Sequence, residues 1–285
     1  MDTQPANTGG DAPASKSTPR KYYEARVRQS NRARYYSLQT GSVIGRAFGT
    51  WFRNLPALIT LAALVQSPVI LGGYLVFTFW PHLATGLGVS IAMIGIEAVV
   101  GSVLSGAVAF VVVRQLMGER ASFTKSLSMG SASLIRVIGT GTLAGVIAAI
   151  GFMLLFIPGV FASCILFVAV PAALFERTGP LESLKRSAFL TKNSRLAILA
   201  ALTVIGVLGR LLGVTFHVAI GAWLGHGVSY SWQARPGEHA IVFVSAQLFE
   251  LFAGTIVPVL VSVVYVQLRQ GKEGATVEAL ASIFD

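Results

Sequence analysis

The main pattern in the sequence is a series of six long apolar stretches separated by short polar segments. They cover residues 55–80, 88–113, 138–157, 160–174, 196–224 and 241–268. A helix needs roughly 20 mainly apolar residues to cross the hydrocarbon core of a bilayer, and only the fourth stretch is clearly shorter. A backbone surrounded by lipid must satisfy its own polar groups. The pattern therefore predicts an all-α integral membrane protein with six transmembrane helices.

Shorter stretches of another kind precede the first, third and fifth spans. In residues 41–54, 122–135 and 180–193, apolar side chains recur at intervals of three and four, which is typical of an amphipathic helix. The side chains expected to face inward are Phe48, Trp51, Leu127, Leu184 and Ala188. We expect these helices to lie in the cytoplasmic membrane interface, each followed by a two-span hairpin.

This order of elements indicates three parallel repeats, although polar linkers between any three hairpins would look similar. Aligning the first and third amphipathic stretches pairs Arg46 with Arg186 and Trp51 with Thr191. The chain then divides into a disordered, basic cytoplasmic tail (residues 1–40), a six-span membrane domain (41–270) and a cytoplasmic C-terminal segment (271–285). Basic and tyrosine residues alternate over 21–36, which suits a solvated arm or, alternatively, an anchor to lipid headgroups.

Composition supports a membrane protein, because 54% of residues are hydrophobic and only 12% are charged, against about 25% charged in ordinary soluble domains. The one cysteine, Cys164, lies within the fourth span and cannot form an intrachain disulfide. The sequence contains no familiar catalytic or metal-binding motif, and the spacing of the loop histidines fits no metal site. We therefore expect neither enzymatic activity nor a metal or other cofactor.

Charge predicts the orientation. Of the 22 Lys and Arg residues, all but Arg210 and Arg235 precede the first span, follow the last, or lie between spans two and three or four and five. The positive-inside rule places these segments and both termini in the cytoplasm. The net charge of +10 then reflects topology and attraction to anionic lipid, not nucleic-acid binding. The cations expected to face lipid at the interface are Arg46, Arg53, Lys125, Lys185 and Arg186.

Ionisable side chains inside the spans are the best functional clue. They are Glu97, Arg210, His217 and Glu250. A charge at membrane depth costs at least ~2.5–3.5 kcal/mol on insertion scales, and Glu97, Arg210 and Glu250 fall at similar depths. We therefore expect Arg210 to contact one of the two acids. The cluster is either a structural ion pair or part of a proton or substrate path.

Small residues and prolines within the spans have simpler interpretations. Spacings such as Gly209-x-x-x-Gly213 indicate close helix packing. Pro68, Pro171 and Pro258 could mark kinks or broken helices.

Two segments resemble a known family. Residues 179–187 read Gly-Pro-Leu-Glu-Ser-Leu-Lys-Arg-Ser and continue to Leu-Thr-Lys-Asn at 190–193, while Tyr265-Val-Gln-Leu-Arg269 and Glu273-Gly274 precede a Phe-Asp ending. They are similar to segments of the bacterial six-helix membrane proteins related to YciC and to the membrane domain found beside glycerophosphodiester phosphodiesterases. Gln267 stands where that family has an acid. The resemblance, over about residues 41–285, implies the fold and a bacterial inner-membrane location more than an activity.

Two functions remain open at this point. The first is a non-catalytic inner-membrane protein that organises lipids or protein partners, including further copies of itself, at the cytoplasmic face. The alternative is a small transporter or lipid-translocating unit that uses Glu97, Arg210 and Glu250.

Overall fold

The computed structural model describes residues 38–80, 86–116, 123–224 and 236–274. Within these ranges the chain is helical without strands, and six segments are long and apolar enough to cross a membrane. The prediction of an all-α chain with six candidate spans is therefore confirmed. Most of the predicted tail and of the C-terminal segment 271–285 lies outside the described residues, as do the side chains of Lys125 and Leu127.

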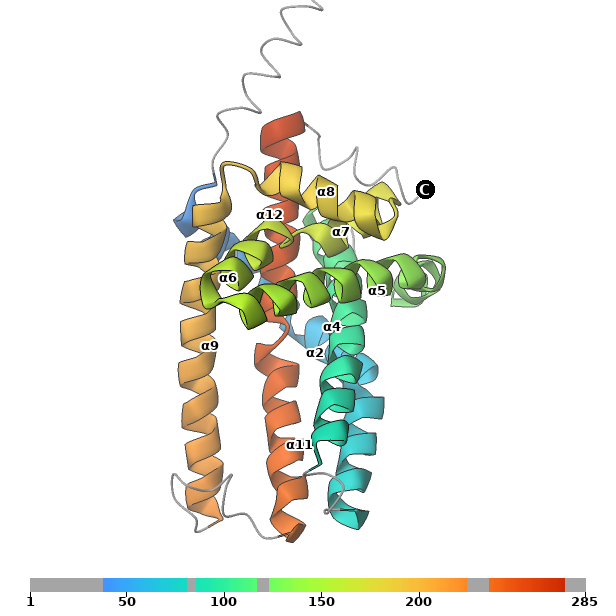
Figure 1. The fold of residues 1–285 in the computed structure, drawn as a ribbon, viewed down its shortest axis with the longest axis vertical. Coiled ribbons are helices and arrows are strands. Elements are labelled where there is room, and N and C mark those ends of the chain that lie inside the picture. Colours follow the sequence, from blue (N-terminus) through green and yellow to red (C-terminus); the bar gives the residue numbers. More distant parts are fainter. Residues whose placement is uncertain (1–37, 81–85, 117–122, 225–235, 275–285) are drawn as a thin grey trace, which may run out of the picture.

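The elements follow one another along the chain as a series of helices (Figure 1). They are α2 (Thr40–Phe79), α4 (Leu87–Leu116), α5 (Phe123–Leu154), α6 (Phe156–Ile165), α7 (Ala169–Glu176), α8 (Pro180–Thr191), α9 (Arg195–Trp223), α11 (Pro236–Ala253) and α12 (Ile256–Glu273). Figure 1 shows α4, α9, α11 and α12 running along the long axis of the molecule, with α8 near the upper end of the molecule.

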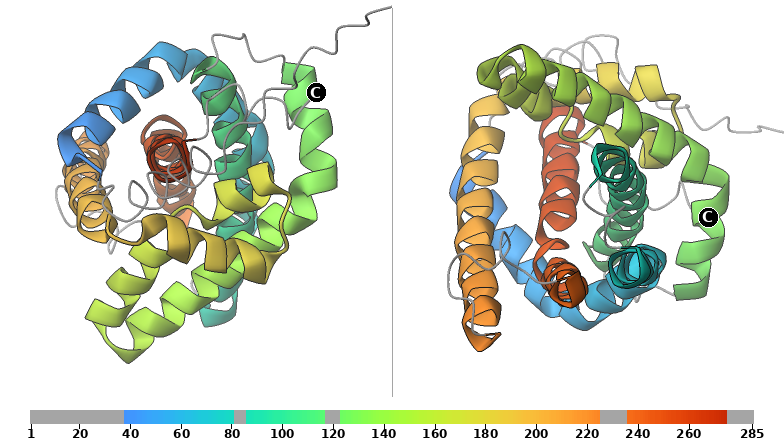
Figure 2. Two further views of the ribbon diagram at one scale, coloured as in Figure 1. Left: turned by 90° about the horizontal axis from the view of Figure 1, so that it is seen from above. Right: turned by 60° about the horizontal axis from the view of Figure 1, so that its bottom comes forward.

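Helix α12 forms the centre of the upper part of the molecule. Every residue from 259 to 268 is buried, and the ring of Tyr265 stacks on Phe175 of α7 with 5.5 Å between centroids. Seen from above, α12 is surrounded by the first part of α2, by α4, by α8 and by α9 (Figure 2). A helix that is apolar on nearly all sides suits this enclosed position.

The first amphipathic stretch and the first span form one helix, α2. It continues through Pro56 and Pro68 without a break. Figure 2 shows that α2 curves around the molecule, so that its first part runs in a different direction from its last part. Proline removes a backbone donor and crowds the preceding turn, which accounts for the bending. Trp51, which was expected to face inward, is buried, and Phe48 is half-buried.

The third predicted span has an unexpected direction. Helix α5 lies across the long axis in Figure 1, and the view from above in Figure 2 shows its length from the side. Helix α6 folds back on α5 after Leu155, and two glycines permit the contact, because a Cβ at Gly151 would lie only 2.9 Å from the Cα of Gly159. The middle hairpin therefore lies across the direction of the other spans, and the three hairpins are not equivalent in orientation.

Two predicted spans are broken. The fourth divides into α6 and α7, and the sixth divides into α11 and α12. In both cases a proline is the third residue of the second helix, namely Pro171 in α7 and Pro258 in α12. The proline ring clashes with the carbonyl four residues earlier, which here belongs to Phe167 or Gly254 at the break. Pro68 differs, because α2 is continuous around it.

Candidate functional site

A network of charged side chains joins α7, α8 and α12. Arg186 Nε donates to both carboxylate oxygens of Glu176, at 2.9 and 2.7 Å, and Arg186 Nη2 donates to Glu273. Arg269 Nε lies 3.3 Å from Glu273 Oε2. The hydroxyl of Tyr265 donates to Glu176 at 3.1 Å and accepts from Arg269 at 3.0 Å. Two arginines and two glutamates thus neutralise one another around a buried tyrosine.

Arg186 therefore has a different role from the one predicted. Burial opposes its charge, but the hydrogen bonds and attraction of Glu176 and Glu273 outweigh burial and raise the pKa of the guanidinium above its ordinary value. A guanidinium already paired with two carboxylates has little capacity left for a phosphate. Arg186, which was expected to face lipid, is thus bonded to acids of α7 and α12, whereas the adjacent Lys185 is exposed.

Polar side chains of α8 complete the broken fourth span. Ser187 Oγ donates to the carbonyl of Ile165 at 2.7 Å and accepts from the backbone N–H of Val168 at 3.2 Å. Thr191 Oγ1 donates to the same Ile165 carbonyl at 3.2 Å. A break within a membrane helix exposes backbone groups that lipid cannot satisfy. Helix α8 supplies the missing partners from its buried face.

Two other hydrogen-bonded contacts hold α12. Trp51 Nε1 of α2 donates to Thr255 Oγ1, beside the break in the sixth span, at 2.8 Å. Near the other end of α12, Lys272 Nζ donates to the carbonyls of Phe189 and Lys192, at 3.1 and 2.6 Å. The carbonyls at the end of a helix have no helical partner, so Lys272 caps α8. The first part of α2 and the whole of α8 thus each support a broken span.

A cavity of about 430 Å³ lies between the first part of α2 and α12. Arg46 and Arg53 line it from α2, and Gln267 and Gln270 line it from α12. Gln267 is only 7% exposed, and its Nε2 has no hydrogen-bond partner within the described part of the chain. Gly49 also borders the cavity, and a Cβ there would meet nothing within 4 Å. The cavity therefore combines two cations with an unpartnered amide donor.

The ionisable residues within the spans line two adjoining cavities. Glu97 of α4 and Glu250 of α11 border a cavity of about 350 Å³, and so does Gln66, whose buried Oε1 has no hydrogen-bond partner among the described residues. Arg210 and His217 of α9 border a second cavity, of about 680 Å³, and Glu250 also lines this one. The structure thus places the four predicted residues around two cavities that share Glu250 as a lining residue.

The predicted ion pair of Arg210 is not formed. In the described ranges, no ion pair within 4.0 Å joins Arg210 to Glu97 or Glu250. Glu97 instead accepts a hydrogen bond from Gln247 Nε2 at 3.2 Å. The Glu250 carboxylate occupies the space beside Gly254, where a Cβ would lie 2.0 Å from Oε1.

The glycines of α9 border this space, and the packing interpretation holds only in part. A Cβ at Gly209 would meet nothing within 4 Å, whereas one at Gly213 would touch the ring of Phe249 at 3.4 Å. His217 Nδ1 lies 2.7 Å from the carbonyl of Gly213. The face of α9 around Gly209 therefore leaves the cavity open.

Several residues of the charged network and of the cavity beside α12 were not identified as site residues from the sequence. They are Glu176, Tyr265, Gln267, Arg269 and Glu273. A signal was present, because Tyr265, Arg269 and Glu273 are spaced four residues apart and share one helix face. The two segments that carry the family resemblance meet in this network. The described residues contain no group of three His, Cys, Asp or Glu side chains that could hold a metal ion.

Comparisons of the chain with protein-family models, with curated proteins and with solved structures found no match. Function therefore has to be argued from the geometry of these sites.

Proposed function

We propose that this chain is a non-enzymatic bacterial inner-membrane protein that binds anionic lipids at a cytoplasmic basic face and thereby organises them. The observation that carries the proposal is the cavity of Arg46, Arg53 and Gln267. Guanidinium and amide N–H groups are strong donors to phosphate oxygens. A buried donor without a partner costs about 1–3 kcal/mol, and a phosphate oxygen at Gln267 Nε2 would offset that cost.

The surroundings of the cavity support binding from the membrane. Phe52 of α2 is 63% exposed beside Arg53, and on α8 the exposed Leu181 and Phe189 flank Lys185. Exposed apolar and basic side chains together are typical of helices in the membrane interface. The first part of α2 and α8 take this role in our proposal, as equivalent parts of the first and third repeats. Their similar support of broken spans favours a repeat relation between these two helices, whereas kinship with the YciC-related family rests on the two sequence segments that resemble it.

The proposed site can be tested by native mass spectrometry of the full chain with phosphatidylglycerol. Arg46→Gln and Arg53→Gln should each weaken binding about fivefold, because a cation near an anionic surface contributes about 1 kcal/mol. Gly49→Leu should also weaken it, since the side chain would enter the cavity without meeting protein. Lys185→Gln removes an interfacial charge that does not line the cavity, and Gly45→Leu adds a side chain outside the cavity at a position where a Cβ also meets nothing within 4 Å. As matched controls, both should weaken binding less than the cavity variants.

Two outcomes would contradict this site. One is equal binding of phosphatidylglycerol by all five variants. The other is equal binding of zwitterionic phosphatidylcholine by the unaltered chain, because the cations would then have no selective effect. Competition by soluble glycerol phosphate would separate recognition of the phosphate from recognition of the whole lipid.

A second candidate function is translocation of a lipid headgroup along the cavities of Glu97, Arg210 and Glu250. The observation that favours it is the lack of an ion pair between Arg210 and either acid in the described residues, combined with the position of Glu250 in the lining of both cavities. Charged groups within a membrane span that face a cavity are typical of substrate paths.

A lipid-scrambling assay in vesicles tests this second function. If the path exists, the chain should accelerate the exchange of fluorescent phosphatidylglycerol between leaflets, measured by quenching with dithionite. Gly209→Leu should slow exchange severalfold, because its side chain would occupy the larger cavity. Gly72→Leu, on α2 and outside both cavities, should have no effect. Exchange no faster than in protein-free vesicles would exclude this function.

A further inference from the structure

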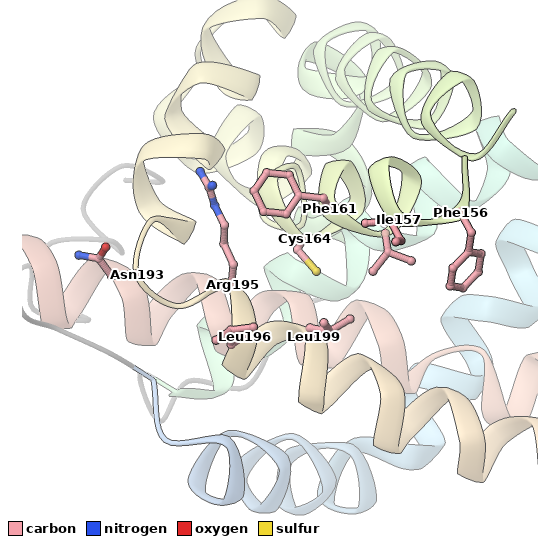
Figure 3. A pocket seen from close by; sticks show the side chains of 9 residues that line it. Phe156, Ile157, Phe161, Cys164, Asn193, Arg195, Leu196 and Leu199 are labelled. Atoms are coloured by element: carbon pink, nitrogen blue, oxygen red, sulfur yellow. The ribbon is translucent and has the colours of Figure 1, made fainter. Parts of the chain in front are cut away.

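A separate cleft of about 530 Å³ lies between α6 and the start of α9. Figure 3 shows Arg195 and Asn193 at one end of this cleft and Phe156 and Ile157 at the other. The apolar side chains that line it are Phe156, Ile157, Val160, Phe161, Leu196 and Leu199. The cleft is thus an apolar surface with a cation at one end, and its volume falls within the roughly 300–1,000 Å³ of small-molecule sites.

Arg195 provides the cation. Its guanidinium lies over the ring of Phe161, 5.0 Å from the centroid, and its Nε is buried without a hydrogen-bond partner among the described residues. It forms no ion pair within the described ranges. Lys192 and Lys272 add positive charge close by. The local charge is therefore unbalanced, and an anionic acceptor would satisfy both the charge and the free donor.

The apolar walls require a second property of the ligand. Ile157 is 78% exposed, Phe161 is 52% exposed and Leu196 is 82% exposed. Contiguous exposed apolar side chains mark a surface that another apolar group covers. A ligand that is anionic at one end and apolar along its length meets both requirements.

The position of the cleft in the fold agrees with such a ligand. Arg195 is the first residue of α9, which begins beside α8 at the basic end of the molecule (Figure 1). In a membrane, a headgroup phosphate would lie at the polar end of the cleft and an acyl chain would extend along α6 and α9. The geometry points to binding of one acyl chain of an anionic phospholipid, with its headgroup phosphate on Arg195. This cleft shares no lining residue with the cavity of Arg46 and Arg53, so either site can fail alone.

Cys164 offers a direct test, because it is the only cysteine in the chain, lines the cleft and is 3% exposed. The rate of its alkylation by a maleimide would be measured on the full chain in nonionic detergent, with and without added lipid. Phosphatidylglycerol should slow alkylation at least threefold, while phosphatidylcholine at the same concentration should not. The ratio of the two rates is compared within each variant, so an altered intrinsic thiol reactivity does not affect the result.

Variants distinguish a specific site from general lipid coating. Arg195→Gln should abolish the protection, whereas Lys192→Gln, which removes a neighbouring charge but no group that lines the cleft, should retain most of it. Leu196→Trp should also abolish protection by filling the cleft, and the high exposure of Leu196 leaves room for the larger side chain. Arg46→Gln should keep full protection.

Three results would overturn the assignment. They are equal protection by phosphatidylcholine, unchanged protection in Arg195→Gln, and protection by a single-chain fatty acid but not by phosphatidylglycerol.

Discussion

Arg186 is the one side chain of the network that bonds to both carboxylates, Glu176 and Glu273. Its Nε lies 2.7 Å from Glu176 Oε2, and its side chain is 22% exposed while that of Glu176 is 14% exposed. Partial burial makes such a bridge stronger than a surface ion pair but costly to leave incomplete. Because the pKa of Arg186 is raised above an already high value, the guanidinium stays charged at every physiological pH.

Removal of this charge should destabilise the protein. Arg186→Gln leaves Glu176 and Glu273 without their shared cation, and we expect a loss of about 1–3 kcal/mol in unfolding free energy. The measurement is denaturant unfolding in detergent. Adding Glu273→Gln to Arg186→Gln should restore part of the loss, and a double-mutant cycle measures the coupling. The neighbouring Lys185→Gln is the control, with an expected change within about 0.5 kcal/mol. An additive cycle would contradict the bridge.

At the scale of elements, hydrophobic patterning predicted which segments are helical, but not how they lie. Length and apolarity identified the six spans, and Pro171 and Pro258 marked two real breaks. The direction of α5 could not be predicted from hydropathy. An apolar side chain avoids water equally well against lipid and against another helix, so its hydropathy does not indicate how the helix lies. The exposed tip of its hairpin with α6, where residues 153–157 are each at least 69% exposed, looks the same in sequence as the end of an upright span.

The polar contacts between elements were predictable only in part. Arg186 was selected as a cation, yet its acids are Glu176 and Glu273, and the second lies 87 residues away in sequence. Arg210 was expected to pair with an acid at similar depth, but equal depth along two helices does not make their faces meet. Glu250 and Arg210 lie on different walls of one cavity, and the open face of α9 at Gly209 keeps that cavity unfilled. Whether two such side chains meet depends on how each helix is rotated about its own axis. The pattern of a single sequence gives little information about that rotation.

In the whole molecule, one end of the helix bundle carries a group of basic residues. The first part of α2, helix α8 and the end of α12 gather at one end (Figure 1). That end holds Arg46, Arg53, Lys185 and Arg195. At the opposite end lie the last residues of α2 and α9 and the beginnings of α4 and α11. Proposals that place lipid phosphate at the basic end require this end to face the cytoplasm.

Cysteine labelling of intact cells tests that orientation. In a Cys164→Ala background, one cysteine would replace Lys185 on α8 and another, in a separate variant, would replace Gly86 just before α4; both positions are exposed. We expect an impermeant maleimide added outside to label Gly86→Cys and not Lys185→Cys, because the positive-inside rule retains the basic segments in the cytoplasm. Lysis should make both positions reactive, which controls for local accessibility. The reverse pattern would place Arg46, Arg53 and Arg195 on the outer side and remove the cytoplasmic basis of the lipid-binding proposal. Labelling of both positions in intact cells would instead contradict a single fixed orientation.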